Sequence, residues 1–198
     1  MKRFTCLFII FYSLLNMDLF AQEDVNKQQT NKEVKTEFMI LKLTYGNVEI
    51  ELYPDKAPNH VERFKKLAED GKYDGVVFHR VISGFMAQSG DVKFGNSKNS
   101  NFDLSLVGTG GSELPNLKAE FNDLPHERGT LSAARSQDPD SANSQFFICF
   151  DSAPFLDRQY SAFGKVTKGM EFVDMIKKGD PNSGAVSNPD KIISIRLK

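Results

Sequence analysis

The stretch FHRVISGFMAQSGD, Phe78 to Asp91, carries apolar and alternating residues on both sides of Ser83-Gly84. This pattern predicts a β-hairpin that folds back at Ser83-Gly84. Arg80 stands inside the first arm of the hairpin, and buried arginines are rare unless another group pairs with them. The period of two places Met86 and Gln88 on the same face as Arg80. Arg80 is therefore predicted to face either plain solvent or a ligand.

The chain before this hairpin predicts another hairpin and a helix. Residues 38–53, FMILKLTYGNVEIELY, alternate on both sides of Gly46-Asn47, which marks the turn. Residues 57–71, APNHVERFKKLAEDG, have apolar side chains at three- and four-residue steps and stop at a glycine, as helices commonly do. This helix is expected to cover one open end of a curled sheet. Its predicted inward face consists of Val61, Phe64, Lys65 and Ala68.

The chain after the hairpin predicts a long loop, more strands and a second helix. Residues 90–113 are rich in Gly, Ser and Asn, which is typical of a loop. Strands are predicted in GTLSAA (129–134), SQFFICF (144–150), SAFGKV (161–166) and KIISIRLK (191–198), and a helix in GMEFVDMIKKG (169–179). About eight strands with two helices predict a mainly β fold, an antiparallel barrel capped at its ends.

The first 21 residues are typical of a secretory signal peptide. Lys2 and Arg3 precede an apolar run over residues 4–15, and Ala21 provides a small residue before polar sequence. Because the run is shorter than the ~20 residues that a spanning helix needs, we predict cleavage after Ala21 and no stable membrane insertion. A retained membrane anchor is the alternative. The expected product is exported, most plausibly to the periplasm of a Gram-negative bacterium.

Residues 22–36, QEDVNKQQTNKEVKT, are polar and lack aromatic side chains. Such a segment cannot bury enough apolar surface to stay ordered, so a disordered tether is predicted there. The folded domain is then expected to span residues 37–198. The whole chain is 40% hydrophobic and 26% charged, which is typical of a globular protein. Its net charge of −1 offers no basic stripe for phosphates, so we expect no nucleic-acid partner.

Cysteine and histidine usage argues against redox and metal chemistry. Once the signal segment is removed, Cys149 is the one remaining cysteine, and it cannot form an internal disulfide. Its neighbours predict a small buried thiol in a strand. His60, His79 and His126 are scattered without ligand spacing, so we expect no metal site.

Four dispersed segments resemble one protein family. They are FHRVISGFMAQSGD, GTLSAA, SQFFICF and FLDRQYSAFGKV, in that order, and they are similar to the signature segments of the cyclophilin-type peptidyl-prolyl cis/trans isomerases. The resemblance covers residues 38–198. It implies an eight-stranded antiparallel β-barrel capped by two helices, and barrel closure rests on the resemblance rather than on periodicity. It also implies isomerisation of Xaa-Pro bonds without a cofactor, and we expect a monomer.

The resemblance implies a role for each matching residue. Arg80 would be the catalytic hydrogen-bond donor, and Gln88 would hold its guanidinium or the substrate backbone. The backbone near Ala134 and Arg135 would pair with an extended peptide, and Gln145 would line the groove. The implied walls of the proline pocket are Phe85, Met86, Phe147 and Leu156, with Tyr160 beside them.

This sequence departs from the family pattern at several positions. Phe155 stands where many members have tryptophan, so we expect only weak binding of cyclosporin. Tyr160 replaces a common histidine, and Arg135 replaces an asparagine common in eukaryotic members. The segment 92–111 looks longer than in compact members, and it could either border the groove or be a surface loop.

Two function classes therefore stay open. The first is an isomerase that acts on proline-containing unfolded or extended polypeptides and assists the folding of exported proteins. The second is a proline-peptide binding module or chaperone with little turnover. An Arg80, Gln88 and Phe147 set favours the isomerase, because a pure binder has no chemical reason to keep the donor.

Overall fold

A computed structural model describes residues 37–198; the predicted signal peptide (1–21) and tether (22–36) lie outside these residues. The alternating segment at the start forms β1 (Glu37–Lys42) and β2 (Asn47–Leu52), which pair antiparallel. The turn is closed by a 2.9 Å hydrogen bond from Leu43 N to Gly46 O. The predicted hairpin is confirmed, but its turn occupies residues 43–46, because Asn47 already pairs with Lys42.

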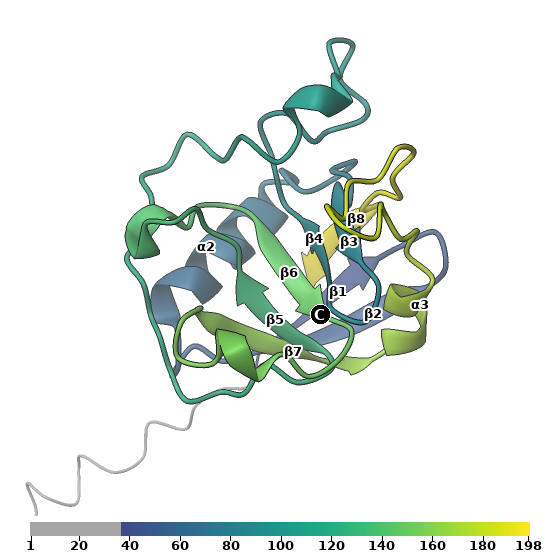
Figure 1. Cartoon of the computed structure of the whole chain (residues 1–198). Coiled ribbons are helices and arrows are strands. Elements are labelled where there is room, and N and C mark those ends of the chain that lie inside the picture. The colour runs from purple at the N-terminus through teal and green to yellow at the C-terminus, as the bar shows by residue number, and fades with distance from the viewer. Residues whose placement is uncertain (1–36) are drawn as a thin grey trace, which may run out of the picture. The chain divides into compact units, whose positions relative to one another are not determined.

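The hairpin around Arg80 forms as predicted. β3 (Arg80–Ile82) pairs with β4 (Met86–Ser89), and Arg80 lies directly opposite Gln88. The remaining strands are β5 (Thr130–Ala133), β6 (Phe146–Cys149), β7 (Ala162–Lys168) and β8 (Ser194–Leu197). All eight strands belong to one antiparallel sheet in the order β3-β4-β6-β5-β7-β2-β1-β8 (Figure 1).

The sheet is curled into a half-barrel rather than a barrel closed by strand pairing. Its order ends at β3 and β8, which do not pair with each other as strands. Instead, the chain before each of them makes backbone contacts: Gly75 N donates to Ile192 O, and Phe78 N donates to Asp190 O, both at 2.8 Å. The predicted mainly β, eight-stranded antiparallel architecture with two helices is confirmed, and the expected closure is corrected to this half-barrel.

In the described part of the chain, two α-helices accompany the sheet and lie on opposite sides of it in Figure 1. They are α2 (Pro58–Glu69) and α3 (Met170–Asp174). The buried face of α2 contains Val61, Phe64 and Ala68 as predicted, together with His60 and Leu67. Lys65 is not part of that face, because its ammonium reaches out to Glu37.

The second helix is shorter than the sequence pattern predicted. Instead of extending the helix, the backbone N–H of Lys177 donates to the Asp190 carboxylate at 2.8 Å. The described residues also contain three 3₁₀ turns: η1 (Leu104–Leu106), η2 (Pro139–Ser141) and η3 (Pro154–Leu156). Within residues 37–198, none of the helices has the length and apolar character needed to cross a membrane.

Alternation along β4 and β6 sends neighbouring side chains into two separate hydrophobic clusters. Ala87, Phe146 and Ile148 join the larger cluster, here called the main core, with inward side chains of the other strands and α2. Met86, Phe147 and Cys149 point to the other face and join a smaller cluster. The period of two thus places a second apolar surface on the back of the core-forming strands.

Candidate active site

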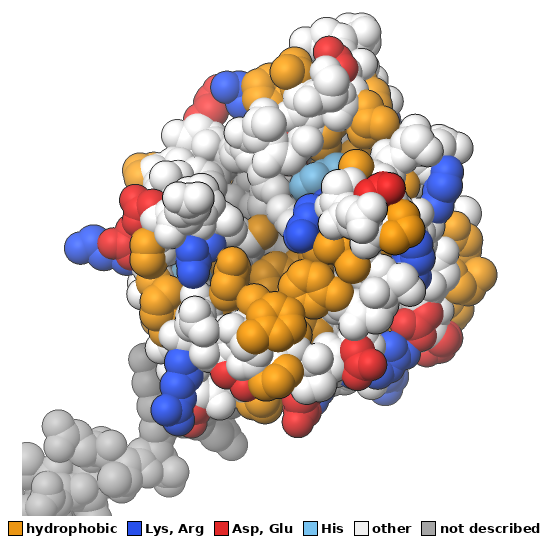
Figure 2. All heavy atoms as spheres, viewed as in Figure 1, with side chains coloured by type: hydrophobic (Ala, Val, Ile, Leu, Met, Phe, Trp, Pro, Cys, Tyr) orange, Lys and Arg blue, Asp and Glu red, His pale blue; other side chains and the backbone are white. Residues whose placement is uncertain are grey.

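The smaller cluster, here called the pocket cluster, contains all five of the residues expected in and beside the walls of the proline pocket. Its buried members are Met86, Phe147, Cys149, Ala153 and Leu156, and its partly buried members are Ile82, Phe85, Ala134 and Tyr160. Figure 2 shows hydrophobic side chains gathered around a hollow, with Lys or Arg side chains at its rim. The structure therefore brings together side chains from β4, β6 and η3 that are distant in sequence.

Aromatic contacts fix the shape of the pocket cluster. The Phe147 and Tyr160 rings meet edge to face with centroids 5.9 Å apart, an arrangement that aromatic pairs prefer. Phe85 and Phe155 lie at the rim with centroids 5.5 Å apart, and Phe155 is 62% exposed. The cluster thus combines an ordered wall with an apolar rim that is open to a ligand.

Arg80 lies at the edge of the pocket cluster. Its Nη1 is 4.0 Å from Met86 Sδ and donates to Gln88 Oε1 at 3.5 Å, and its Nε donates to the Ser183 carbonyl at 3.1 Å. The predicted common face of Arg80, Met86 and Gln88 is confirmed. Among residues 37–198, no hydrogen bond involves Nη2 of Arg80. A permanently charged donor is therefore available beside an apolar pocket.

Gln88 and Gln145 connect Arg80 to the loop that contains Gly108 and Gly110. Gln88 Nε2 donates to Gln145 Oε1 at 2.9 Å. Gln145 Nε2 in turn donates to the carbonyl oxygens of Gly108 and Gly110, at 3.0 and 2.7 Å. Both amide orientations are determined by these partners, because each amide nitrogen faces an oxygen. The two glutamines hold the guanidinium and the loop in one hydrogen-bonded chain.

A polar cavity of about 230 Å³ adjoins this chain of hydrogen bonds. The predicted site residues Gln88, Ala134, Arg135 and Gln145 all contribute to its lining. The other lining residues are Gly108, Thr109, Gly110, Ser136, Ser141 and Asn143. The site therefore has two compartments, the apolar pocket cluster and the polar cavity, with Gln88 between them.

The loop 108–110 was not among the predicted site residues. The sequence left open whether residues 92–111 border the groove or form a surface loop, and this end of the segment forms a wall of the polar cavity. Asp91, which is fully buried, holds it there: its Oδ2 accepts from Gly108 N at 2.7 Å and from Gly110 N at 2.9 Å. The aspartate at the end of the hairpin motif was the available signal, since a buried carboxylate needs several donors.

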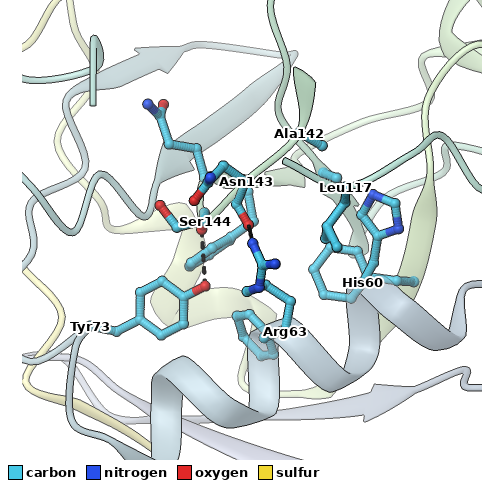
Figure 3. Close-up of a pocket in the computed structure, with 12 residues that line it drawn as sticks. His60, Arg63, Tyr73, Leu117, Ala142, Asn143 and Ser144 are labelled. Carbon is cyan, nitrogen blue, oxygen red and sulfur yellow. Dashed lines mark hydrogen bonds between the residues drawn. The ribbon is translucent and has the colours of Figure 1, made fainter. Parts of the chain in front are cut away.

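Residues behind the strands position the floor of the polar cavity. Figure 3 shows Arg63 and Tyr73 directed at the backbone of residues 143–144. Arg63 Nη1 donates to Asn143 O at 3.3 Å, and the Tyr73 hydroxyl donates to Ser144 O at 2.9 Å. Burial raises the pKa of Tyr73 far above its ordinary value, so the hydroxyl stays a donor. The void between these residues measures about 10 Å³, roughly enough for one water and far too small for a peptide.

Arg135 and Ala134 form the edge against which an extended peptide was expected to pair. The Arg135 guanidinium donates to Ser136 O and Gln159 O at 2.8 and 3.0 Å, and its carbon lies 4.4 Å from the Tyr160 ring centre. Ala134 N is already bonded to Gln145 O at 3.0 Å. In the described chain, the carbonyl of Ala134 and the N–H of Arg135 have no backbone partner. These two backbone groups at the edge are therefore the ones that could pair with an extended peptide.

The ring of Phe147 packs against His126, which is held by two hydrogen-bond partners. His126 contacts Asp157 Oδ1 through Nδ1 and Ser132 Oγ through Nε2, both at 3.0 Å. Its ring stacks on Phe147 with centroids 6.1 Å apart. Burial lowers the pKa of His126, although the Asp157 carboxylate opposes that shift. The imidazole is therefore neutral at pH 7, and it is enclosed rather than open to a substrate.

The other titratable candidates, Cys149 and His79, make no side-chain hydrogen bond to Arg80 or Gln88, although Cys149 lies within the pocket cluster. Cys149 is fully buried, and burial raises its pKa to about 12, so the predicted inert thiol is confirmed. The ring of His79 lies against Gly108, where an added Cβ would be 2.9 Å from His79 Cδ2, and burial lowers its pKa. Across residues 37–198, no three His, Cys, Asp or Glu side chains are grouped so that they could hold a metal ion.

Comparison with known proteins agrees with this geometry. The family model described as "Cyclophilin type peptidyl-prolyl cis-trans isomerase/CLD" matches residues 38–197. A protein of Brucella suis named "Probable peptidyl-prolyl cis-trans isomerase" is 59% identical over 161 residues, which cover 81% of this chain and 82% of that protein. A Helicobacter pylori "Peptidyl-prolyl cis-trans isomerase" is 38% identical over 159 residues, covering 78% of this chain and 90% of the relative.

Solved structures give the same result. A Cryptosporidium parvum cyclophilin-type isomerase, solved in the presence of the dipeptide Ala-Pro, superposes with a TM-score of 0.69 at 28% identity, covering 81% of this chain and 98% of that one. The cyclophilin AquaCyp293 from Hirschia baltica has a TM-score of 0.65 at 28% identity, over 80% and 72% of the two chains. With the family model matching over most of its length, this chain belongs to the cyclophilin-type peptidyl-prolyl cis-trans isomerases.

Proposed function

We propose that this isomerase accelerates rotation about Xaa-Pro bonds in exported proteins and thereby assists their folding, with Arg80 as the catalytic donor. The observation that carries the proposal is the placement of the Arg80 guanidinium between Met86 of the pocket cluster and Gln88 beside the polar cavity. A permanently charged donor at this boundary suits a reaction whose substrate is an apolar ring next to a peptide backbone.

The chemistry of the bond explains why a donor is enough. Amide resonance holds the prolyl bond planar with a barrier of ~18–20 kcal/mol. In the twisted transition state, resonance is lost and the proline nitrogen regains its lone pair. A donor aimed at that nitrogen therefore binds the transition state more tightly than either planar ground state. No nucleophile, general base or metal is required for this rotation.

The two compartments supply the positioning. The pocket cluster would hold the proline ring through apolar contact with Phe147, Met86 and Leu156. The Ala134 carbonyl and the Arg135 N–H would pair with the backbone of the extended peptide, as an added strand does. A related isomerase was solved in the presence of Ala-Pro, which supports a proline-containing ligand for this pocket.

Replacement of Arg80 tests the catalytic assignment. A charge-assisted hydrogen bond contributes ~1.5–3 kcal/mol, so Arg80→Ala is expected to lower kcat/KM toward an Xaa-Pro peptide by about one to two decades. Arg80→Lys should remain impaired, because an ammonium lacks the planar fork that contacts Gln88 and the nitrogen together. The matched control is Arg196→Ala, which removes a guanidinium bonded to Asp74 at the β8 edge of the sheet.

Two outcomes decide between the function classes. Full activity in Arg80→Ala, with a much lower melting temperature, would mean that Arg80 is structural. Tight binding of a proline peptide by the wild type without catalysed exchange of its cis and trans signals in NMR would favour the binding module or chaperone. The isomerase proposal requires catalysed exchange in the wild type and in Arg196→Ala, and much slower exchange in Arg80→Ala.

The exported location rests on the N-terminal sequence, with Lys2 and Arg3 before an apolar run and Ala21 at its end. Expression of the full chain in a Gram-negative host, followed by fractionation and N-terminal sequencing, tests it. A periplasmic product that begins at Gln22 is expected. A product that keeps Met1 and sediments with membranes would contradict cleavage and favour an anchor.

A further inference from the structure

The turn over residues 179–186, GDPNSGAV, has no assigned role, although it contacts Arg80 directly. The Ser183 carbonyl accepts from Arg80 Nε at 3.1 Å, whereas the Gln88 contact to Nη1 is longer at 3.5 Å. The better hydrogen bond to this guanidinium thus comes from a turn more than one hundred residues away in sequence. A bond to Nε fixes the plane of the fork, because the Nη groups follow the orientation of Nε.

Asp180 builds the turn that presents this carbonyl. Its Oδ1 accepts from Asn182 N at 3.0 Å, from Ser183 N at 2.9 Å and from Ser183 Oγ at 3.0 Å. Its backbone closes the same turn, since Gly184 N donates to Asp180 O at 2.8 Å. An aspartate that bonds the backbone two and three residues ahead is a known way to fix a tight turn. Asp180 therefore determines where the Ser183 carbonyl points.

The turn is also attached to the strand that carries Arg80. Val81 N donates to Gly184 O, and Gly179 N donates to Val81 O, both at 2.8 Å. Gly184 adopts a positive φ of +78°, and an added Cβ would lie 2.6 Å from Ile82 Cγ1 and 3.0 Å from Arg80 Cγ. The turn thus packs closely on the stem of Arg80, so a shift of the turn moves the guanidinium.

We propose that Asp180 is a positioning residue for Arg80, acting through the Ser183 carbonyl that its side chain holds in place. The inference rests on the proposed catalytic role of Arg80. The carbonyl engages Nε, which leaves the Nη groups directed away from the turn and available to the prolyl nitrogen and to Gln88. Without the Asp180 side chain, the turn loses three hydrogen bonds, and Arg80 samples other rotamers.

Asp180→Ala, Asp180→Asn and Asp103→Ala form the test set. Asparagine keeps an Oδ1 acceptor and should restore the turn, so charge and geometry are separated. Asp103 is the matched control, because its carboxylate likewise bonds the backbone two residues ahead, accepting from Ser105 N at 2.9 Å and Ser105 Oγ at 2.7 Å, and it neither bonds Arg80 nor lines the polar cavity. Both aspartates are exposed, so neither substitution opens a cavity.

The expected result is a loss in kcat. Asp180→Ala should lower kcat about threefold to tenfold with KM little changed, as when one hydrogen bond to a catalytic group is lost. Asp180→Asn should recover most of the rate, and Asp103→Ala should match the wild type. In ¹⁵N NMR, the Arg80 Nε–H resonance should be resolved in the wild type and in Asp180→Asn, and should broaden or move to the position of a free arginine in Asp180→Ala.

Each other outcome overturns the proposal. A kcat of Asp180→Ala equal to that of the wild type would show that the turn has no effect on catalysis. An unchanged Arg80 Nε–H signal in Asp180→Ala would show that other contacts hold the Ser183 carbonyl. An equal loss in Asp180→Asn would assign the effect to charge. Arg80→Ala is measured alongside: if it is fully active, the catalytic assignment itself fails, whereas an impaired Arg80→Ala with an active Asp180→Ala sinks the positioning role alone.

Discussion

The main core and the pocket cluster share two strands but differ in how completely they are enclosed. Along β6, Phe146 and Ile148 enter the main core, and Phe147 and Cys149 enter the pocket cluster. Phe146 is surrounded by the rings of Phe64 and Tyr73, with centroids at 5.3 and 5.5 Å. The pocket cluster instead ends in exposed Phe155 and half-buried Phe85. One strand thus provides stability on one face and a binding surface on the other.

This difference shows how the sheet can carry a binding site on one face while the burial of the other face maintains the free energy of unfolding. The main core is covered on all sides, so its apolar burial is fully realised in the free protein. The pocket cluster is completed only when a ligand covers its open side. Substitutions in the two clusters should therefore separate the free energy of unfolding from activity.

The largest expected effect comes from truncating neighbouring phenylalanines. Phe146→Ala removes a fully buried ring and leaves a cavity in the main core, so it should cost about 3–5 kcal/mol of unfolding free energy. Phe147→Ala should cost less, because water can enter the open side of the pocket cluster, but it should raise KM for an Xaa-Pro peptide and lower kcat/KM by at least about tenfold.

Urea denaturation and kinetics on the two purified variants check this pair of effects. At a temperature where Phe146→Ala is still folded, its kcat should be close to that of the wild type. Equal losses of stability in both variants, with activity retained in Phe147→Ala, would show that the two faces of β6 are not divided in this way.

His126 gives an intermediate effect, since it supports the pocket cluster with a buried ionisable group. Burial lowers its pKa from the ordinary 6.5, and His79 is shifted in the same direction. As the pH falls below about 7, the unfolded chain takes up protons that the folded protein does not bind, so the free energy of unfolding decreases. One such group contributes at most about 1.4 kcal/mol per pH unit, and the decrease stops below the folded pKa.

Removing the titrating group tests this dependence. The free energy of unfolding is measured by urea between pH 5 and 7.5 for the wild type, His126→Gln and His79→Gln. Each variant should show a flatter decrease than the wild type toward low pH, whatever its stability at pH 7.5. A slope in His126→Gln equal to that of the wild type would mean that His126 titrates in the folded protein as it does in the unfolded chain.

Sequence alone predicted the features that depend on neighbouring residues. Alternation predicted the two hairpins, over residues 38–53 and around Ser83-Gly84, and the common face of Arg80, Met86 and Gln88. The family resemblance supplied the other pocket positions, such as Leu156 and Tyr160, which the structure gathers into one cluster.

The features that sequence did not predict depend on distant partners. The second helix ends early because Asp190 captures the N–H of Lys177, and periodicity within the helix carries no trace of that contact. Gly108 lines the cavity because its N–H donates to Asp91, which is seventeen residues away in sequence. The Ser183 carbonyl accepts from Arg80, which is 103 residues away. A local pattern cannot show which distant donor or acceptor will meet it, so these parts of the site needed the fold.

The smallest expected effect concerns the open rim of the pocket cluster. Phe155 is 62% exposed beside Phe85, and it cannot donate the hydrogen bond that an indole N–H could give to a ligand such as cyclosporin. We expect Phe155→Trp to tighten cyclosporin binding by one hydrogen bond, ~0.5–1.5 kcal/mol or about threefold to tenfold in Kd, measured by calorimetry.

Phe155→Leu, which also lacks a donor, serves as the control, and its binding of cyclosporin should stay weak. Because the rim is exposed, neither change should alter the melting temperature by more than a few degrees. If Phe155→Trp and Phe155→Leu bind equally, the rim contributes only apolar contact, and the difference between the enclosed core and the open pocket lies in packing alone.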